Sequence, residues 1–477
     1  MVFSSLTFLF LFLPLMLAAY YACPPRHRNA VALAGSLFFY AWGAPRFVVV
    51  LVVSSLADYL LSRMLPAGQG APGRRKGVLA LAVAMNVGLL LYFKYANFFV
   101  AELNGWLARF GAGETEWTAV ALPIGISFFT FQKVSYLVDV YRGTAKVARN
   151  AADYLLYVAL FPQLIAGPIV RYHDVALQLI RRDHTRERFF TGILRFCQGL
   201  GKKVLVANTM AEVADAAFGA APGSLPCGWA WLGVVAYAFQ IYFDFSGYSD
   251  MAIGLGRMLG IEFLENFNRP YVSRTITEFW RRWHISLSNF MREYLYIPLG
   301  GNRHGAVRTY FNLWLVFLVS GFWHGAAWNF VAWGAFHGFF LCLDKAFKGT
   351  RISRAPAWVG LPATFVLVLF SWVLFRAESL AHAVAYMGRM LDVFGAAPEA
   401  AAAIEFGRRH AATLAAAVVL CFGPALKPHP FDFMRLDPAN ATVGQAAVRY
   451  AVAMALLVWS AATLATSSFN PFIYFRF

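Results

Sequence analysis

Long runs of apolar residues, separated by short polar stretches, occupy most of the 477-residue chain. A helix needs roughly 20 apolar residues to cross a lipid bilayer, and fewer when other helices surround it. By this measure about twelve runs qualify, so the pattern predicts a helical protein that crosses the membrane many times. The runs lie near residues 3–21, 29–43, 47–64, 78–99, 119–140, 190–209, 229–247, 309–325, 327–346, 357–376, 411–426 and 447–467.

The basic residues between these runs predict the orientation. Arg26 and Arg28 follow the first run, Arg74 and Arg75 follow the third, and Arg142 follows the fifth. Loops rich in Lys and Arg stay on the cytoplasmic side of a membrane. We therefore expect the N-terminus to face outward and these three loops to face the cytoplasm.

One apolar segment, residues 152–170, breaks the alternation because a second basic stretch, residues 171–188, follows it. A full crossing would place that basic stretch outside. Pro162, Gly167 and Pro168 argue against a straight helix. The sequence therefore predicts a re-entrant hairpin, which must be buried in protein because lipid does not tolerate irregular exposed backbone.

Composition agrees with a membrane protein and narrows its partners. The chain is 60% hydrophobic and 14% charged, whereas soluble domains carry about 25% charged residues. The net charge is +17, but the basic residues sit in short loops, so the charge fits a lipid bilayer and argues against nucleic acid. The five cysteines are scattered without a Cys/His cluster, so neither a metal site nor a disulfide framework is expected.

An amphipathic segment, residues 273–305, carries the first candidate for chemistry. Thr275 and Glu278 have the spacing of a capping box at a helix start. Apolar residues then recur at helical spacing as far as Tyr294, which predicts one interfacial helix with His284 at the border of its apolar stripe. An incidental histidine on an interfacial helix explains the same pattern.

The stretch "LVSGFWHGAAWNFVAWGAFHG", residues 318–338, carries two more histidines. His324 falls towards the outer end of a predicted span, where burial keeps an imidazole neutral and suited to act as a general base. A core histidine satisfied by a carbonyl is the alternative, and His337 fits packing better than chemistry. Elsewhere, Gln132 and Lys133 suggest a wet interior surface, and the carboxylate Asp244 could line an aqueous path or bond to backbone.

Several long motifs resemble the membrane-bound O-acyltransferase family. The pairing of "FWRRWHISLSNFMREYLYIPLGGNR" (279–303) with "GFWHGAAW" (321–328) is typical of it, and "FPQLIAGPI" (161–169) and "ENFNRPY" (265–271) agree. The resemblance implies an all-α polytopic fold with about 11–13 membrane helices, plus re-entrant and interfacial helices, around a central tunnel. We expect one integral-membrane domain.

That expected domain covers residues 1–477. Its parts would be N-terminal spans over residues 1–110, a catalytic core over about 118–346, and C-terminal spans over residues 357–477.

The resemblance also implies site residues. It places the catalytic base on His324 and a second functional histidine on His284. Arg281, Arg282, Trp283 and Asn289 become candidates for holding the acyl donor or lining the tunnel. The implied reaction moves an acetyl group from a cytoplasmic thioester, acetyl-CoA, to a hydroxyl on the outer side, with no metal and no tightly bound cofactor.

The branch that these motifs resemble acetylates exopolysaccharides such as alginate in the bacterial inner membrane. It implies periplasmic esterase-like (SGNH) acetyltransferase partners and polysaccharide export machinery. Cellulose, peptidoglycan and D-alanylated teichoic acid are alternative acceptors. A transporter of polysaccharide or lipid carrier without chemistry, or a scaffold for a soluble acetyltransferase, remains an alternative of another class.

Overall fold

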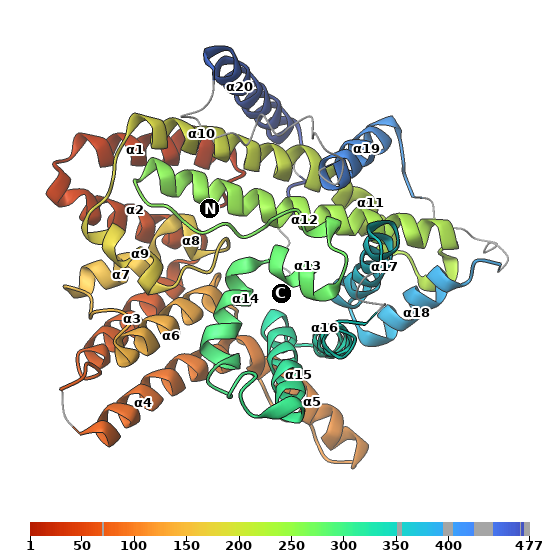
Figure 1. Ribbon diagram of the computed structural model, residues 1–477, viewed down its shortest axis with the longest axis horizontal. Coiled ribbons are helices and arrows are strands. Elements are labelled where there is room, and N and C mark those ends of the chain that lie inside the picture. Colours follow the sequence, from red (N-terminus) through yellow and green to blue (C-terminus); the bar gives the residue numbers. More distant parts are fainter. Residues whose placement is uncertain (69–70, 351–354, 395–403, 424–441, 468, 472–477) are drawn as a thin grey trace. The chain divides into compact units, whose positions relative to one another are not determined.

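The protein is described by a computed structural model that covers residues 1–68, 71–350, 355–394, 404–423, 442–467 and 469–471 (Figure 1). Every regular element within these ranges is a helix, which confirms the predicted all-α class. The chain forms two compact units. Unit 1 comprises Met1–Phe189 and Leu255–Leu264, and unit 2 comprises Phe190–Gly254 and Glu265–Phe477.

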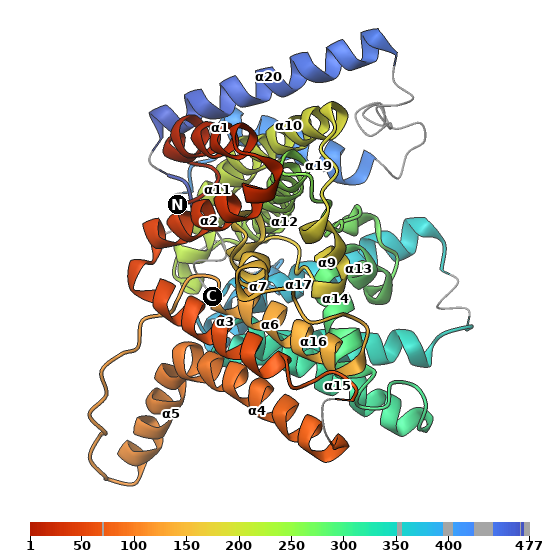
Figure 2. The same ribbon diagram turned by 90° about the vertical axis from the view of Figure 1, so that its left-hand side faces the viewer.

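Unit 1 contains the N-terminal helices, and α7 packs against both α2 and α3 while α6 packs against α3 and α4 (Figure 2). Its helices are α1 (Leu13–Ala22), α2 (Arg28–Gly43), α3 (Val48–Ser62), α4 (Pro72–Leu90), α5 (Ala96–Arg109), α6 (Ile126–Arg142), α7 (Ala151–Ala159), α8 (Phe161–Leu164) and α9 (Tyr172–Ile180).

Unit 2 carries the histidine-bearing segments, and its α16 packs against both α15 and α17. The helix α10 (Arg186–Gly201) leads into it. The others are α11 (Asn208–Gly219), α12 (Cys227–Met258), α13 (Ile276–Arg282), α14 (Ile285–Met291), α15 (Gly305–His324), α16 (Trp328–Ala346), α17 (Ala357–Arg376), α18 (Leu380–Leu391), α19 (Arg408–Phe422) and α20 (Val443–Thr466).

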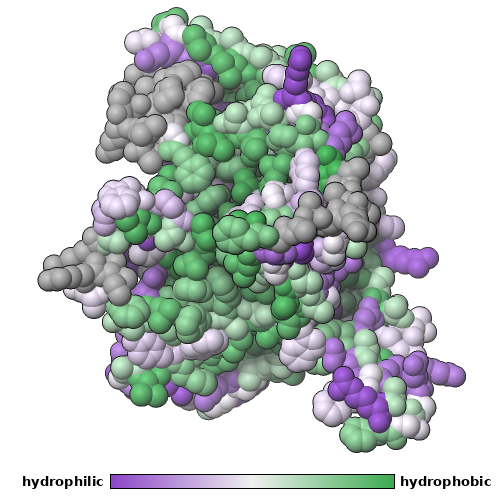
Figure 3. Space-filling model, turned by 90° about the vertical axis from the view of Figure 1, so that its right-hand side faces the viewer, coloured by the Kyte–Doolittle hydropathy of each residue, from purple (hydrophilic) through white to green (hydrophobic). Residues whose placement is uncertain are grey.

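Five helical stretches among the described residues are long and apolar enough to cross a membrane. They are Pro45–Ser62, Pro72–Arg109, Gly305–His324, Ala357–Arg376 and Val443–Thr466. Figure 3 shows one face of the molecule on which hydrophobic residues predominate, as lipid contact requires. The total of about twelve crossings, the central tunnel and the single-domain organisation stay predictions; residues 424–426 of one predicted span lie outside the described ranges.

The predicted span near residues 119–140 begins too early. In the structure α6 starts at Ile126, after the helix-breaking residues Pro123 and Gly125. Gly125 has a φ of 77°, and a Cβ there would lie 2.6 Å from the carbonyl oxygen of Leu164. The helix must therefore start after this close approach of two backbones, which no hydropathy pattern reveals.

The break predicted within residues 152–170 is confirmed. α7 ends at Ala159, the short helix α8 carries Pro162 in its first turn, and the chain then runs without regular structure past Gly167. Residues 154–170 are all buried, as irregular backbone at membrane depth requires. One buried carbonyl oxygen of this irregular stretch, that of Val170, accepts a hydrogen bond from the hydroxyl of Tyr157 at 2.9 Å.

A buried ion pair joins three helices of unit 1. The ammonium of Lys133 on α6 lies 3.0 Å from a carboxylate oxygen of Asp58 on α3, and both side chains are fully buried. The amide of Asn86 on α4 donates to the other carboxylate oxygen at 2.7 Å. The wet surface expected around Lys133 is therefore wrong, because the ammonium is neutralised by a carboxylate 75 residues earlier in the chain.

Candidate active site

His324 is the last residue of α15, and main-chain geometry orients its ring. Its Nδ1 lies 2.7 Å from the carbonyl oxygen of Ser320. Because a carbonyl oxygen only accepts hydrogen bonds, Nδ1 carries the proton and the neutral ring has its lone pair on Nε2. The side chain is buried, with the rings of Trp333 and Phe375 at 4.9 and 5.4 Å between centroids.

His284 interrupts the amphipathic segment. The prediction of one continuous helix from residue 276 to 294 is wrong, because α13 ends at Arg282 and α14 begins at Ile285. Between them His284 adopts the left-handed conformation with φ 45°, which is costly for a residue with a Cβ. The side chain is 1% exposed, and its Nδ1 lies 3.1 Å from Oδ1 of Asn266.

The start of this segment is closer to the prediction. The hydroxyl of Thr275 accepts a hydrogen bond from the backbone N–H of Glu278, as a helix cap should. The Glu278 carboxylate accepts from the N–H of Arg274 instead of completing the capping box on Thr275. The N-terminal cap is thus confirmed in its first half only.

His284 and His324 are close enough to interact electrostatically. Burial lowers the pKa of His284 well below its usual range, and the positive charge that His324 would carry lowers that pKa further. His284 is therefore neutral at physiological pH. The structure thus brings together, within unit 2, the two histidines that the sequence singled out from different motifs.

The third histidine, His337 on α16, is fully buried in aromatic packing. The indole N–H of Trp280 donates to its Nδ1 at 3.2 Å. The ring of Trp333 lies 4.9 Å from the ring of His337 and also 4.9 Å from that of His324. His337 therefore supports the ring that packs on His324, in agreement with the packing interpretation.

The other predicted donor-binding residues have different surroundings. Arg281 is exposed on α13, whereas Arg282 forms an ion pair at 2.8 Å with Glu278 and is committed to it. Trp283 is buried, with its ring 4.9 Å from that of Trp372. Asn289 is half-buried on α14. Of this group, Arg281 presents its charge to solvent.

Two carboxylates of α12 are paired with cations. Asp244 lies 2.5 Å from the ammonium of Lys203, and both side chains are buried. Asp250 contacts Arg195 at 2.7 Å and Lys202 at 2.6 Å. The cations come from α10 and from the π-helix Lys202–Ala207 that continues it. The aqueous path considered for Asp244 does not fit the burial of its side chain in this ion pair.

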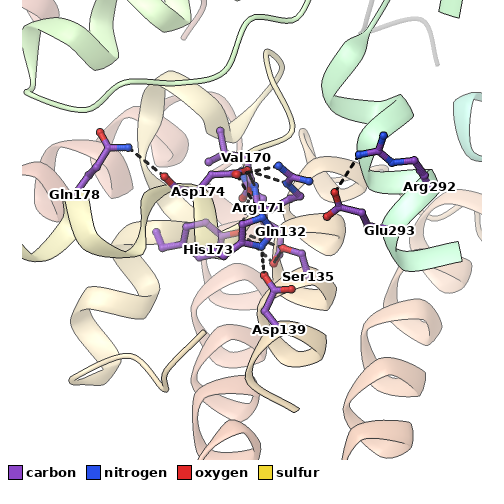
Figure 4. Close-up of polar contacts among 11 residues, drawn as sticks. Gln132, Ser135, Asp139, Val170, Arg171, His173, Asp174, Gln178, Arg292 and Glu293 are labelled. Atoms are coloured by element: carbon purple, nitrogen blue, oxygen red, sulfur yellow. Dashed lines mark hydrogen bonds and ion pairs between the residues drawn. The ribbon is translucent and has the colours of Figure 1, made fainter. Parts of the chain in front are cut away.

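A polar cluster in unit 1 follows the broken segment (Figure 4). Nδ1 of His173 lies 2.8 Å from the buried carboxylate of Asp139, and the guanidinium of Arg171 forms an ion pair with Asp174. The hydrogen bond from His173 to Asp139 raises the pKa of His173, which is partly opposed by burial. Among the residues that the structure describes, no cluster of three or more His, Cys, Asp or Glu side chains could hold a metal ion.

Comparison with known proteins identifies the class. Residues 144–377 match the membrane-bound O-acyltransferase family, a range that includes all three histidines. The chain belongs to this family, and it is a membrane-bound O-acyltransferase with multiple membrane-spanning helices.

Particular relatives support the same assignment. The chain is 43% identical to the probable alginate O-acetylase AlgI of Pseudomonas putida over the whole of both chains. It is 48% identical to the probable alginate O-acetylase AlgI of Azotobacter vinelandii, over 80% of this chain and 76% of that protein. A peptidoglycan O-acetyltransferase of Helicobacter pylori is 38% identical over 83% of this chain and 80% of its own length.

Proposed function

We propose that this protein is an inner-membrane O-acetyltransferase that passes acetyl groups from cytoplasmic acetyl-CoA towards an exopolysaccharide, alginate, on the outer side. The observation that carries the proposal is the burial and the hydrogen bonding of the two histidines. His324 and His284 are both buried, and both are held through Nδ1. The polymer is suggested by two relatives named probable alginate O-acetylase, at 43% and 48% identity.

In the proposed reaction Nε2 of His324 accepts the proton of the attacking hydroxyl. The hydroxyl oxygen bonds to the thioester carbonyl carbon, the carbon–sulfur bond breaks, and the proton passes to the leaving sulfur to give a free thiol. Positioned general bases contribute roughly 10²–10⁴-fold to such steps. His324 lies at the C-terminal end of α15, where the helix dipole favours the imidazolium that forms transiently.

The donor and its partners follow from the same proposal. Acetyl-CoA is a substrate and no tightly bound cofactor is required. Arg281, exposed on α13, is the candidate for attracting the CoA phosphates, while Arg282 is already paired with Glu278. A periplasmic esterase-like acetyltransferase with a serine nucleophile, together with the export machinery, would carry the acetyl group to the polymer.

Peptidoglycan is the second candidate acceptor, because one relative at 38% identity is named a peptidoglycan O-acetyltransferase. Teichoic acid D-alanyltransferases are more distant, at 27% identity over 54% of this chain. Membership of an acyltransferase family argues against a transporter or scaffold without chemistry.

The test uses the full-length protein in membranes or detergent with acetyl-labelled CoA. We expect His324→Ala to reduce acetyl transfer by about 10²-fold or more. His304→Ala is the matched control, since His304 is exposed at the other end of α15. Transfer by His324→Ala near the wild-type rate would overturn the proposed site. Acetyl content of alginate and of peptidoglycan in complemented deletion cells separates the two polymers.

A further inference from the structure

The chain segment at Asn266 runs alongside the break that carries His284. The backbone N–H of Ile285 donates to the carbonyl oxygen of Asn266 at 2.9 Å. The N–H of Asn268 donates to the carbonyl oxygen of Arg282 at 2.8 Å. These bonds join residues 19 and 14 positions apart, and they satisfy backbone groups that a continuous helix would otherwise use.

The side chain of Asn266 adds a second set of contacts and is itself 1% exposed. Its Oδ1 accepts from the backbone N–H of Ser286 at 3.2 Å and from the hydroxyl of the same residue at 2.8 Å. Its Nδ2 donates to the hydroxyl of Ser249 on α12 at 3.2 Å. Because a backbone N–H can only donate, the amide oxygen must face Ser286, and the orientation of the amide is fixed.

This orientation determines the tautomer of His284. The atom 3.1 Å from Nδ1 of His284 is the same Oδ1, which only accepts, so Nδ1 carries the ring proton. The lone pair of the neutral ring is then on Nε2. Nε2 is buried and has no hydrogen-bond partner among the residues that the structure describes.

An unsatisfied buried acceptor costs about 1–3 kcal/mol, so such an atom in a site calls for a ligand that donates a hydrogen bond. An oxyanion has no proton to donate, and the neutral ring in this tautomer has no N–H at Nε2. A role for His284 as an oxyanion stabiliser therefore does not fit this tautomer, and a role in orienting the acyl donor does.

We infer that Asn266 is a positioning residue that holds His284 so that Nε2 accepts a hydrogen bond from an amide N–H of the thioester arm of the acyl donor. The inference rests on the proposed function, in which the acceptor hydroxyl is engaged by His324. The remaining hydrogen-bond donors near the thioester of acetyl-CoA are the amide N–H groups of its pantetheine arm. No covalent step is assigned to His284.

The surroundings of His284 allow this role to be isolated. Phe245 of α12 packs edge-on at 4.6 Å between ring centroids, and Ser249 of the same helix bonds to Asn266. His324 is the titratable group whose charge acts on His284. A substitution at residue 266 therefore changes the hydrogen bonding of His284. His324 is unchanged in the wild type and in the variants at residues 266 and 249.

The experiment compares Asn266→Asp, Asn266→Ala and the control Ser249→Ala in full-length protein that transfers acetyl groups from acetyl-CoA. Asp at 266 keeps an acceptor for Nδ1–H but adds a negative charge, which favours imidazolium. Nε2 then becomes a donor at low pH, so the acid limb of the kcat/KM profile should move up by about one pH unit or more. Ser249→Ala removes only the bond to Nδ2 and should leave the profile in place.

Asn266→Ala should raise KM for acetyl-CoA by about tenfold, the equivalent of one lost hydrogen bond of about 1.4 kcal/mol. An unshifted acid limb in Asn266→Asp, or a lower melting temperature in Asn266→Ala with unchanged KM, would overturn the inference. If one of these results is found while His324→Ala is inactive, the inference about Asn266 fails but the proposed function stands. Absence of any transfer from acetyl-CoA by the wild type would instead remove the proposed function itself.

Discussion

Gly321 of α15 and Gly334 of α16 face each other with no side chain between them. A Cβ built on Gly321 would stand 3.0 Å from the Cα of Gly334 and 2.3 Å from the carbonyl oxygen of Phe330. The two backbones therefore approach as closely as the small-residue contacts that membrane helices use. This approach places Trp333 of α16 against His324 at the end of α15.

Gly321→Ala should consequently disturb the site, although Gly321 itself has no side chain. The added methyl group must push α15 and α16 apart, and overpacking of this kind costs about 1–3 kcal/mol. We expect a lower melting temperature and at least a tenfold lower transfer rate, or about 1.4 kcal/mol in the barrier. Thermal unfolding and acetyl transfer from the same preparation measure both.

Gly338→Ala on α16 is the matched control. A Cβ there would meet its nearest neighbour at 3.5 Å, which is an ordinary van der Waals contact. It should behave like the wild type. Equal effects of the two substitutions would show that the close approach at Gly321 does not matter.

The Asp58–Lys133 pair predicts a strongly non-additive mutant cycle. Removing one partner leaves a fully buried charge, which costs about 3–5 kcal/mol. Asp58→Asn and Lys133→Met should each lower the melting temperature markedly. The double variant should regain much of the loss, because no uncompensated charge remains. Additive losses in thermal unfolding would argue against the pair as a unit.

His173 predicts a pH-dependent stability in unit 1. Its pKa is raised in the folded protein, mainly by the hydrogen bond to Asp139. A raised folded pKa means that the stabilisation is fully present below the unfolded pKa of about 6.5 and is lost as pH rises through the folded value. The melting-temperature difference between wild type and His173→Gln should therefore be larger at about pH 6 than at about pH 9.

Arg188→Gln serves as the control for this experiment, since Arg188 does not titrate in that range and its contact with Asp183 is exposed. Its effect on the melting temperature should be the same at both values of pH. A difference for His173→Gln that grows with pH would contradict the assigned direction.

Hydropathy located most helices because lipid imposes a nearly uniform length on apolar runs. The predicted span 357–376 coincides with α17, and the predicted span 29–43 differs from α2 by one residue. The same reasoning failed at Gly125, where a backbone from another segment decides the start of α6. Local pattern cannot report such an approach.

The candidate site was predicted only in part, because local sequence reveals His324 but not the long-range contacts of His284. His324 could be singled out because an imidazole inside an apolar run is costly and therefore conspicuous. Asn266 was missed as a functional candidate although it lies in the motif "ENFNRPY", because the motif alone does not say which of its residues contacts the site. Its contacts to His284 cross 18 residues. Helical periodicity even gave the wrong backbone for His284, because those contacts outweigh the local preference for helix.

The two histidines differ in how their orientation withstands genetic change. The group that orients His324 is the carbonyl of residue 320, which every amino acid possesses. The group that orients His284 is the amide of Asn266, which a single codon change can remove. Substitutions at position 320 should thus leave the ring of His324 in place, whereas selection should remove substitutions at position 266. A survey of natural variants would reveal that asymmetry directly.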